Sequence, residues 1–158
     1  MGMKPNLGIS GKSRDAVVSE LARLLADEHV LYVKTRNFHW NVTGPHFGPL
    51  HELFEEQYGE IAEAIDEVAE RIRILGGVAP GSMKEFLKLA RIDEQPGGKF
   101  EAEKMIAALL SDHETVIRAL RASVDVAGEA GDKGTEDFLT GLLEAHEKKA
   151  WMLRAHLE

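Results

Sequence analysis

The stretch NFHWNVTGPHFGPLHELFEE, residues 37–56, decides how the first half of this chain folds. It contains three of the seven histidines, and they lie around the pair Gly44-Pro45. A Gly-Pro pair commonly ends a helix, and Pro49 is suited to the first turn of the next one. Apolar residues recur at helical spacing on both sides of the break. The stretch therefore predicts two helices joined by a short link, with histidines gathered at the join.

The same helical spacing of apolar residues continues along most of the chain and predicts four long helices. They are expected over about residues 14–40, 49–75, 100–126 and 135–153. Ser13 and Thr135 are expected as the N-caps of the first and last of these helices, because a hydroxyl can accept a hydrogen bond from a backbone N–H of the first turn. Gly76-Gly77 is expected to end the second helix. No strand, sequence repeat or low-complexity tract is expected.

The links between these helices specify the topology. The first two helices have a short link, as do the last two, so each pair is antiparallel. The link between the second and third helices is long enough to run the length of the bundle. Within it, Ser82 and Glu85 form a capping box that predicts a short helix over residues 83–90. One long crossover is typical of ferritin-like bundles, so the expected fold is all-α: a ferritin-like four-helix bundle with a short extra helix in the crossover between helices 2 and 3.

Composition narrows the class of protein. At 158 residues and 44% hydrophobic, the chain is expected to form one domain with a small core. It has no cysteine, which removes disulfides, thiolate metal sites and cysteine nucleophiles. The ligands left for a metal are imidazole and carboxylate, which suit iron, manganese or zinc. Residues 1–14 show no signal peptide, and no apolar run reaches the roughly 20 residues of a membrane span, so a cytoplasmic protein without membrane contact is expected.

Charge argues against a general nucleic-acid-binding surface. The net charge is −8, whereas binding to a phosphate backbone needs clustered basic residues. The local exception is the N-terminal end, where Lys4, Lys12 and Arg14 occur with no acidic residue among them. Residues 1–13 are interpreted as a flexible tail, with residues 14–158 forming the bundle. A DNA-tethering arm is the alternative interpretation of the tail.

The second helix carries a pattern that suits a metal site. In such bundles the di-iron site is usually built within one chain from Glu-x-x-His pairs, but none of the seven histidines has a glutamate three residues before it. Instead, His51 and Glu55 are four residues apart, and so are Asp66 and Glu70, so each pair shares a helix face. Eleven steps separate Glu55 from Asp66, which is close to three whole turns, so both pairs point the same way.

These two pairs cannot serve one metal centre within one chain. Eleven steps place them roughly 16 Å apart along the helix axis, whereas metal–ligand bonds are about 2 Å long. They can meet if the helix packs antiparallel against the same helix of a second chain, where the numbers of facing residues add to a constant. His51 with Glu70, and Glu55 with Asp66, both add to 121. The spacing therefore predicts two equivalent sites across the twofold axis of a dimer.

Two neighbouring residues fit this dimer. Its axis would pass next to Gly59, whose missing side chain would let two backbones approach, although glycine costs about 1 kcal/mol in a helix. His39, at the end of the first helix, lies near the start of the second across the short link and could supply a further nitrogen ligand. The plain alternative is that an acidic helix face with one histidine is only solvated, and that the matching spacings arose by chance.

The other histidines and the nearby tryptophan are given simpler roles. Surface or packing positions in the fold are expected for His29, His46, His113, His146 and His156. Trp40 is expected to be a core or interface aromatic residue. Because Trp40 is adjacent to His39, it could also intercept an oxidising radical.

Five segments of the chain resemble the Dps family, the DNA-binding proteins from starved cells, which are also called miniferritins. The segments are NFHWN at 37–41, LHELFEE at 50–56, AIDEVAERI at 64–72, GTEDFLT at 134–140 and KAWMLRAHL at 149–157. The resemblance covers nearly the whole chain, and the combination of these segments is highly specific.

The resemblance implies a hollow shell of twelve subunits, built from twofold dimers, with a di-iron ferroxidase centre at each dimer interface. By motif position, His39, His51 and Glu55 would come from one subunit, and Asp66 and Glu70 from its mate. Many relatives have aspartate where this chain has Glu55, so the carboxylate is kept on a longer arm.

The resemblance also implies roles outside the ferroxidase centre. Asp137 matches an acidic residue that lines the threefold iron-entry pore of the family. Glu52 and Glu56 would face the cavity and nucleate mineral. Family members that bind DNA strongly often have a longer lysine-rich tail, so only weak DNA binding is expected of this chain.

Residues and resemblance together predict a cytoplasmic ferroxidase. It would oxidise Fe(II), preferably with hydrogen peroxide, and store ferric mineral in its shell, protecting the cell and its DNA from oxidative damage. Two alternatives stay open. One is a nucleoid-associated structural DNA-binding shell with little ferroxidase activity. The other is a shell whose interface holds zinc or manganese and never turns over.

Overall fold

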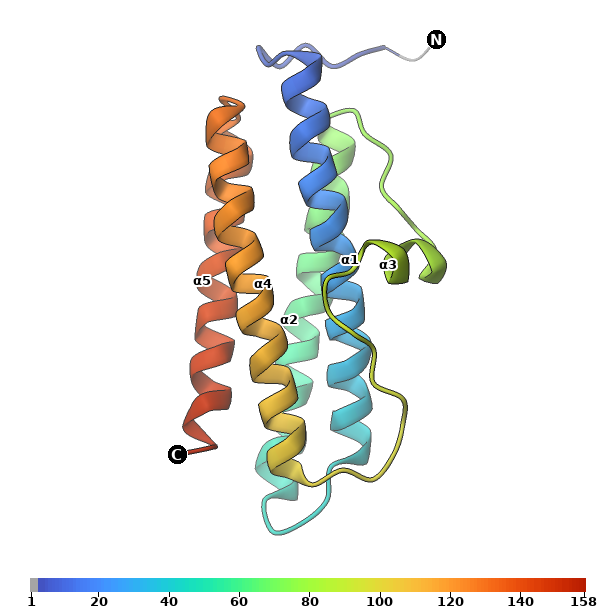
Figure 1. The fold of residues 1–158 in the computed structure, drawn as a ribbon, viewed down its shortest axis with the longest axis vertical. Coiled ribbons are helices and arrows are strands. Elements are labelled where there is room, and N and C mark those ends of the chain that lie inside the picture. Colours follow the sequence, from blue (N-terminus) through green and yellow to red (C-terminus); the bar gives the residue numbers. More distant parts are fainter. Residues whose placement is uncertain (1–2) are drawn as a thin grey trace.

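Four long helices lie side by side as a bundle, and a fifth, short helix lies outside it (Figure 1). The structure is a computed structural model that describes residues 3–158. Its helices are α1 (Gly11–Asn41), α2 (Phe47–Ile74), α3 (Met83–Leu89), α4 (Ala102–Glu129) and α5 (Lys133–Ala155). No residue of the described range is in a strand. The expected all-α bundle with a short helix in the crossover is confirmed.

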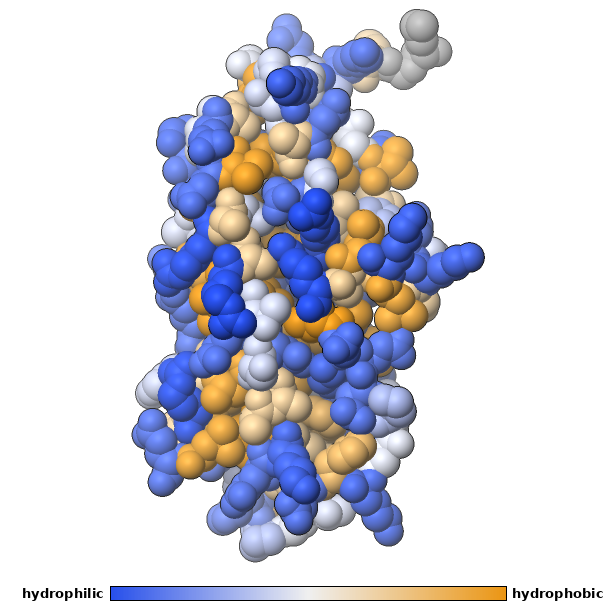
Figure 2. Space-filling model, in the orientation of Figure 1, coloured by the Kyte–Doolittle hydropathy of each residue, from blue (hydrophilic) through white to orange (hydrophobic). Residues whose placement is uncertain are grey.

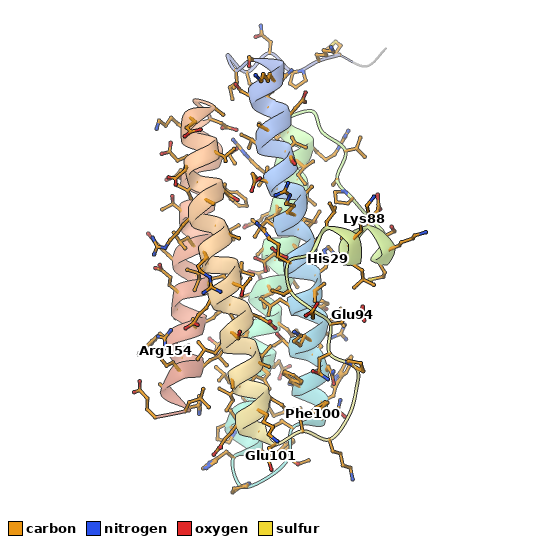
Figure 3. The ribbon with its side chains drawn as sticks, viewed as in Figure 1. His29, Lys88, Glu94, Phe100, Glu101 and Arg154 are labelled. Carbon is orange, nitrogen blue, oxygen red and sulfur yellow. The ribbon has the colours of Figure 1, made fainter. Side chains whose placement is uncertain are left out.

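The helices pack as two antiparallel pairs, α1 with α2 and α4 with α5, and the pairs join mainly through α1 and α4. The crossover leaves the end of α2, passes through α3 beside α1, and reaches the opposite end of the bundle where α4 begins (Figure 1). His29 of α1 points toward this crossover, where its ring stacks on Phe86 of α3 with centroids 3.7 Å apart (Figure 3). None of the helices in residues 3–158 is both long and apolar enough to cross a membrane.

Two predicted N-caps are wrong, and both lie three residues too late. Ser10 caps α1, because its hydroxyl accepts a hydrogen bond from the Ser13 backbone N–H at 3.1 Å. Asp132 caps α5 and accepts from the Thr135 backbone N–H at 3.0 Å. Ser13 and Thr135 therefore occupy the third helical position, where small polar side chains also occur and mimic the signal of a cap.

Other helix ends agree with local sequence signals. Ser82 and Glu85 form both hydrogen bonds of the predicted capping box at the start of α3. Gly76 has φ 85° just after α2, a backbone conformation that glycine adopts without strain. The third long helix runs further than expected, to Glu129, and Gly131 with φ 72° follows its end. Gly128 therefore lies inside the helix.

The N-terminal segment contacts the bundle through Pro5. A Cβ atom added to Gly76 would lie 2.8 Å from the Pro5 Cγ, and Arg14 donates a hydrogen bond to the Pro5 carbonyl. Residues 11–13 belong to α1 and not to the predicted tail. Residues 1–2 of that tail lie outside the described residues, and its flexibility stays a prediction.

The core consists of two hydrophobic clusters with a buried polar layer between them. One cluster is built around Leu21, Leu24, Ile72, Leu120 and Leu139. The other is built around Leu31, Phe38, Phe54, Leu109 and Leu153. Glu28 of α1, His113 of α4 and His146 of α5 lie between the two sets along their helices and are at most 3% exposed. We call these three residues the polar layer.

Candidate metal centre

Two histidines at the join of α1 and α2 form a fixed pair. The His39 Nδ1 lies 2.7 Å from the carbonyl oxygen of His51, and the His51 Nδ1 lies 2.8 Å from the carbonyl oxygen of His39. A carbonyl oxygen only accepts, so each Nδ1 carries a proton and donates. The two rings stack, with centroids 3.8 Å apart and 16° between their planes. In the neutral imidazoles each Nε2 then keeps its lone pair, which is what metal ligation requires.

The short link between the two helices brings the histidines together. α1 ends at Asn41 and α2 begins at Phe47, so the chain reverses within residues 42–46. Gly44 has φ 108°, which a residue with a side chain would adopt only with strain. Val42, 1% exposed, anchors the link in the core, and Phe47 stacks on His51 with centroids 5.0 Å apart. The Gly44-Pro45 break therefore creates the pair by folding α2 back along α1.

The predicted carboxylate ligands lie on α2. Glu55, Asp66 and Glu70 are all exposed in the single subunit, and Glu55 follows His51 by about one turn. Within residues 3–158 of one chain, no group of three or more His, Cys, Asp or Glu side chains is arranged to hold a metal ion. The structure thus brings His39 and His51 together and leaves Asp66 and Glu70 apart from them. The meeting of these residues across a dimer stays a prediction.

Four further residues have predicted roles that depend on an assembled shell. Trp40 is 61% exposed beside the buried His39, which rules out a core position within the subunit. Asp137 is exposed near the start of α5, and Glu52 and Glu56 are exposed on α2. Their roles in radical interception, iron entry and mineral nucleation stay predictions.

An arginine surrounded by aromatic rings lies beside the histidine pair, and the sequence analysis did not identify it. The Arg36 guanidinium carbon is 4.7 Å from the Trp40 ring centroid, 5.2 Å from that of Tyr32 and 5.8 Å from that of Tyr58. Tyr58 in turn meets the His39 ring edge-on, with centroids 5.2 Å apart. We call Arg36, Tyr32, Trp40 and Tyr58 the arginine–aromatic cluster. Its signal in the sequence is the spacing of four residues from Tyr32 to Arg36 to Trp40, which places them on one face of α1.

The polar layer holds a second histidine pair in a different state. The His146 Nε2 lies 2.6 Å from a carboxylate oxygen of Glu28, and the His146 Nδ1 lies 2.9 Å from the His113 Nδ1. Burial, followed by the positive charges of His146 and Lys149, holds the pKa of His113 well below its usual value. The His146 Nε2 can donate to the Glu28 carboxylate, which only accepts, whereas the ring tautomers decide which Nδ1 donates in the contact between the two histidines.

The polar layer corrects and extends the sequence interpretation of these histidines. His113 and His146 are core residues, which agrees with the packing position that was one of the two expectations. The acidic partner that the sequence pattern lacked is Glu28, which contacts His146. The second oxygen of Glu28 and the Nε2 of His113 have no hydrogen-bond partner in the described residues. Sequence reasoning missed Glu28 because it lies 118 residues from His146 along the chain.

Solved structures and family matches place this bundle in a known class. Residues 18–158 match the ferritin-like domain family. A Dps protein of Vibrio cholerae O1, described as a member of a broad superfamily of ferritin-like diiron-carboxylate proteins, superposes with a TM-score of 0.93 at 33% identity, covering 100% of this chain and 99% of that one. A Dps protein of Bacillus brevis superposes with a TM-score of 0.90 at 40% identity, covering 95% and 100%. The fold is therefore that of a ferritin-like protein.

Sequence relatives define the family more narrowly. The DNA protection during starvation protein 2 of Bacillus anthracis is 44% identical over 141 residues, which is 89% of this chain and 96% of the relative. An uncharacterised low temperature-induced protein of Nostoc sp. is 49% identical over 154 residues, which is 97% of this chain and 86% of the relative. The chain belongs to the Dps family, and the resemblance seen in its motifs is confirmed.

Proposed function

We propose that this protein is a miniferritin that oxidises Fe(II) at sites shared between two subunits and stores the ferric product in a shell. The observation that carries the proposal is the His39–His51 pair. Its Nδ1 protons are committed to backbone carbonyls, its rings are parallel, and both Nε2 lone pairs remain for a metal. Membership of the Dps family, and the description of the Vibrio cholerae relative as a ferritin-like diiron-carboxylate protein, support it.

The iron ligands would come from two copies of the chain. His39, His51 and Glu55 of one copy would face Asp66 and Glu70 of the other. Imidazole and carboxylate suit Fe(II), and the carboxylates also favour the more highly charged Fe(III) product. Exposed large apolar side chains support pairing of two copies, because pairing would cover apolar surface; they include Val33, Trp40, Phe47, Met83 and Leu87. Figure 2 shows apolar patches among mostly hydrophilic residues on the face that includes α3.

The reaction we propose moves two electrons from two irons to one peroxide. Two Fe(II), one hydrogen peroxide and two protons give two Fe(III) and two waters, so no hydroxyl radical is released. Fe(II) would enter through pores lined by Asp137, drawn by the negative field of the chain, and mineral would grow near Glu52 and Glu56. The twelve-subunit shell made of such dimers is part of the same proposal.

A complementation experiment tests the shared site. His51→Ala and Asp66→Ala each remove a ligand from both sites of a homodimer, so each variant alone should lose peroxide-dependent Fe(II) oxidation. In a mixed dimer one site receives both substitutions and the other receives neither. Co-assembly of the two variants in equal amounts should therefore restore about a quarter of the sites, because about half of the dimers are mixed.

The outcomes separate the possible sites. Recovery after co-assembly, and none when the two proteins are mixed without disassembly, supports a site built from two subunits. No recovery would contradict the shared site, and parental activity in the double variant His51→Ala/Asp66→Ala would contradict the ligand assignment altogether. Metal analysis of the purified protein distinguishes the alternative in which zinc or manganese holds the interface, since that protein should oxidise Fe(II) slowly or not at all.

DNA binding is the weaker part of the expectation. Of the three basic residues near the N-terminus, Arg14 is engaged with the Pro5 carbonyl. Lys4 and Lys12 remain, against a net charge of −8. A gel-shift titration at low and physiological salt tests this point, and tight binding at physiological salt would favour the structural DNA-binding shell.

A further inference from the structure

The arginine–aromatic cluster places a positive charge against three rings that could each lose an electron. Arg36 lies over the Trp40 ring at 4.7 Å and also donates a hydrogen bond to the Tyr32 hydroxyl at 3.2 Å. No Asp or Glu of residues 3–158 forms an ion pair with Arg36, so its charge is not neutralised within the subunit. The rings are therefore the groups that its charge acts on most directly.

The same cluster adjoins the candidate metal centre. Tyr58 touches the ring of His39 edge-on at 5.2 Å, and Trp40 is the next residue after His39 in the chain. An oxidant formed at iron held by His39 would thus have tyrosine and tryptophan within short electron-transfer reach. Hydrogen peroxide needs two electrons for reduction to water. If only one Fe(II) is present, the second electron can come from one of these rings.

A nearby cation makes that protein oxidation unfavourable. The face of a neutral aromatic ring attracts a cation, and this attraction is lost when the ring gives up an electron. The indole radical cation that forms first would also be repelled by the guanidinium, although water screens this repulsion in part because Trp40 is 61% exposed. Arg36 therefore lowers the tendency of Trp40, and of the tyrosines it touches, to serve as electron donors.

We propose that Arg36 directs the source of the second electron, so that peroxide is reduced by a second Fe(II) and not by the protein. The competing reaction consumes one Fe(II), one tryptophan, one hydrogen peroxide and one proton. It yields one Fe(III), a neutral tryptophanyl radical and two waters, because the O–O bond is cleaved by one electron from iron and one from the indole, which also loses its N–H proton. This role rests on the proposed ferroxidase function, and it makes Arg36 a positioning residue that acts through the rings.

The chain contains an internal reference for the test. Trp151 on α5 is 62% exposed, almost the same as the 61% of Trp40. Within the described residues, no arginine or lysine lies over its ring. The ratio of oxidised Trp40 to oxidised Trp151 in one sample therefore reports the effect of Arg36 and cancels differences in the total dose of oxidant.

The experiment compares Arg36→Met, which removes the charge and keeps a flexible stem, with Arg36→Lys, which keeps a cation. Each assembled protein is loaded with about one Fe(II) per proposed site and treated with hydrogen peroxide. Trp40 and Trp151 oxidation is then measured by peptide mass spectrometry and protein radicals by electron paramagnetic resonance. We expect the Trp40 to Trp151 ratio to rise about two- to fivefold in Arg36→Met, the factor that corresponds to a cation–π contact at a partly exposed site. In Arg36→Lys it should stay near the parental value.

A second measurement needs no iron and separates the two proposals. The metal-free proteins are oxidised by azide radicals, a one-electron oxidant that acts on tryptophan. A higher Trp40 ratio in Arg36→Met than in the parent supports the role of Arg36 on the ring even if iron is never oxidised, in which case only the ferroxidase proposal fails. Equal ratios in parent and Arg36→Met with azide radicals would overturn the inference while leaving the ferroxidase proposal intact, and so would equal ratios with peroxide in a protein that does oxidise Fe(II).

Discussion

The two histidine pairs of this protein have the same composition and opposite chemistry. In the His39–His51 pair, both Nδ1 atoms donate to backbone carbonyls, and the rings are nearly parallel. In the His113–His146 pair, the two Nδ1 atoms face each other at 2.9 Å and the rings are tilted by 50°. The Nε2 of His146 is hydrogen-bonded to the Glu28 carboxylate. The first pair leaves one Nε2 on each ring for a metal. In the second pair both nitrogens of His146 are engaged within the core, and the Nε2 of His113 is buried without a partner in the described residues.

The difference shows that the number of histidines in a cluster does not define a metal site. What decides the chemistry is which ring nitrogen is committed, and to what. Backbone carbonyls fix the tautomer and leave the other nitrogen available. A carboxylate and a second imidazole instead occupy both ring nitrogens of His146 within the core. The following predictions test this contrast, from the largest effect to the smallest.

Removing one imidazole from the His39–His51 pair should slow Fe(II) oxidation far more than removing one from the His113–His146 pair. We expect His39→Gln to lower the rate of peroxide-dependent Fe(II) oxidation by at least about 100-fold, because a direct ligand should matter at least as much as the groups that orient ligands. The matched variant His113→Gln should keep the parental rate per assembled particle. Stopped-flow absorbance of the ferric product measures both. Equal losses in the two variants would contradict the contrast.

The His113–His146 pair and its partner Glu28 should matter more for the free energy of unfolding than the candidate metal centre does. Glu28→Ala removes the carboxylate that contacts His146 in the core, and removing one partner of a buried ion pair costs about 3–5 kcal/mol. Urea unfolding at pH 7 should show a free energy of unfolding that is lower by about this amount. Glu55→Ala removes an exposed carboxylate of the candidate metal centre and should change the free energy of unfolding by less than about 0.5 kcal/mol. A midpoint for Glu28→Ala close to that of Glu55→Ala would contradict a stabilising role of the Glu28–His146 contact.

Acid should destabilise the fold through His113. Its pKa is lowered in the folded chain by burial and by His146 and Lys149, so the unfolded chain binds the proton more readily. Stability is then lost as the pH falls below the ordinary value of 6.5, by up to about 1.4 kcal/mol per pH unit. Urea midpoints at pH 7.5 and 5.5 measure the loss.

The control for this pH dependence is His113→Leu, which should flatten it. Asp27 and Asp112 have raised pKa values, chiefly from burial, and act with the opposite sign, because the folded chain keeps their protons more readily. Both carboxyls remain in the His113→Leu variant, so the change in slope isolates the histidine. An unchanged slope would assign the acid sensitivity to other groups.

Gly59→Ala should have the smallest effect. A gain in stability would reflect helix propensity within the subunit, whereas a loss of assembly would reflect close contact between two copies of α2. Among residues 3–158, no atom outside the neighbouring turns of α2 lies within 4 Å of a Cβ at this position, so alanine should stabilise α2 by about 1 kcal/mol. If two copies of α2 approach each other there, as the predicted site at His39 and His51 requires, the added methyl groups should weaken the dimer instead. Thermal unfolding measures the stability of the fold, and sedimentation at several protein concentrations measures the strength of the assembly. A more stable protein with unchanged assembly would place the twofold axis elsewhere.

The sequence predicted the features that short-range patterns encode. The four long helices, the capping box of Ser82 and Glu85, and the end of α2 before Gly76-Gly77 follow from spacing and from side chains within one turn. The caps at Ser10 and Asp132 were missed because Ser13 and Thr135 carry a similar polar signal at the third helical position.

Features that depend on distant residues could not be predicted in this way. Glu28 meets His146 only because α1 and α5 share a core, and no local pattern relates two residues so far apart in sequence. Tyr58 joins Arg36 from the neighbouring helix, so spacing along α1 reveals only part of the arginine–aromatic cluster. The His39–His51 pair was foreseen because the link between its helices is short. Its predicted carboxylate partners, Asp66 and Glu70, would come from a second copy of the chain, so the structure of one subunit does not test them.

The reciprocal hydrogen bonds between His39 and His51 also close the hairpin of α1 and α2. Each folded subunit thus presents two oriented imidazoles before it meets another, whereas the carboxylates that would complete the proposed site arrive only with the partner. If the proposed shared site forms, a newly made subunit would bind iron weakly and would not oxidise it. Oxidation would begin only where assembly has already provided a compartment for the insoluble product, so quaternary structure would set the timing of the chemistry.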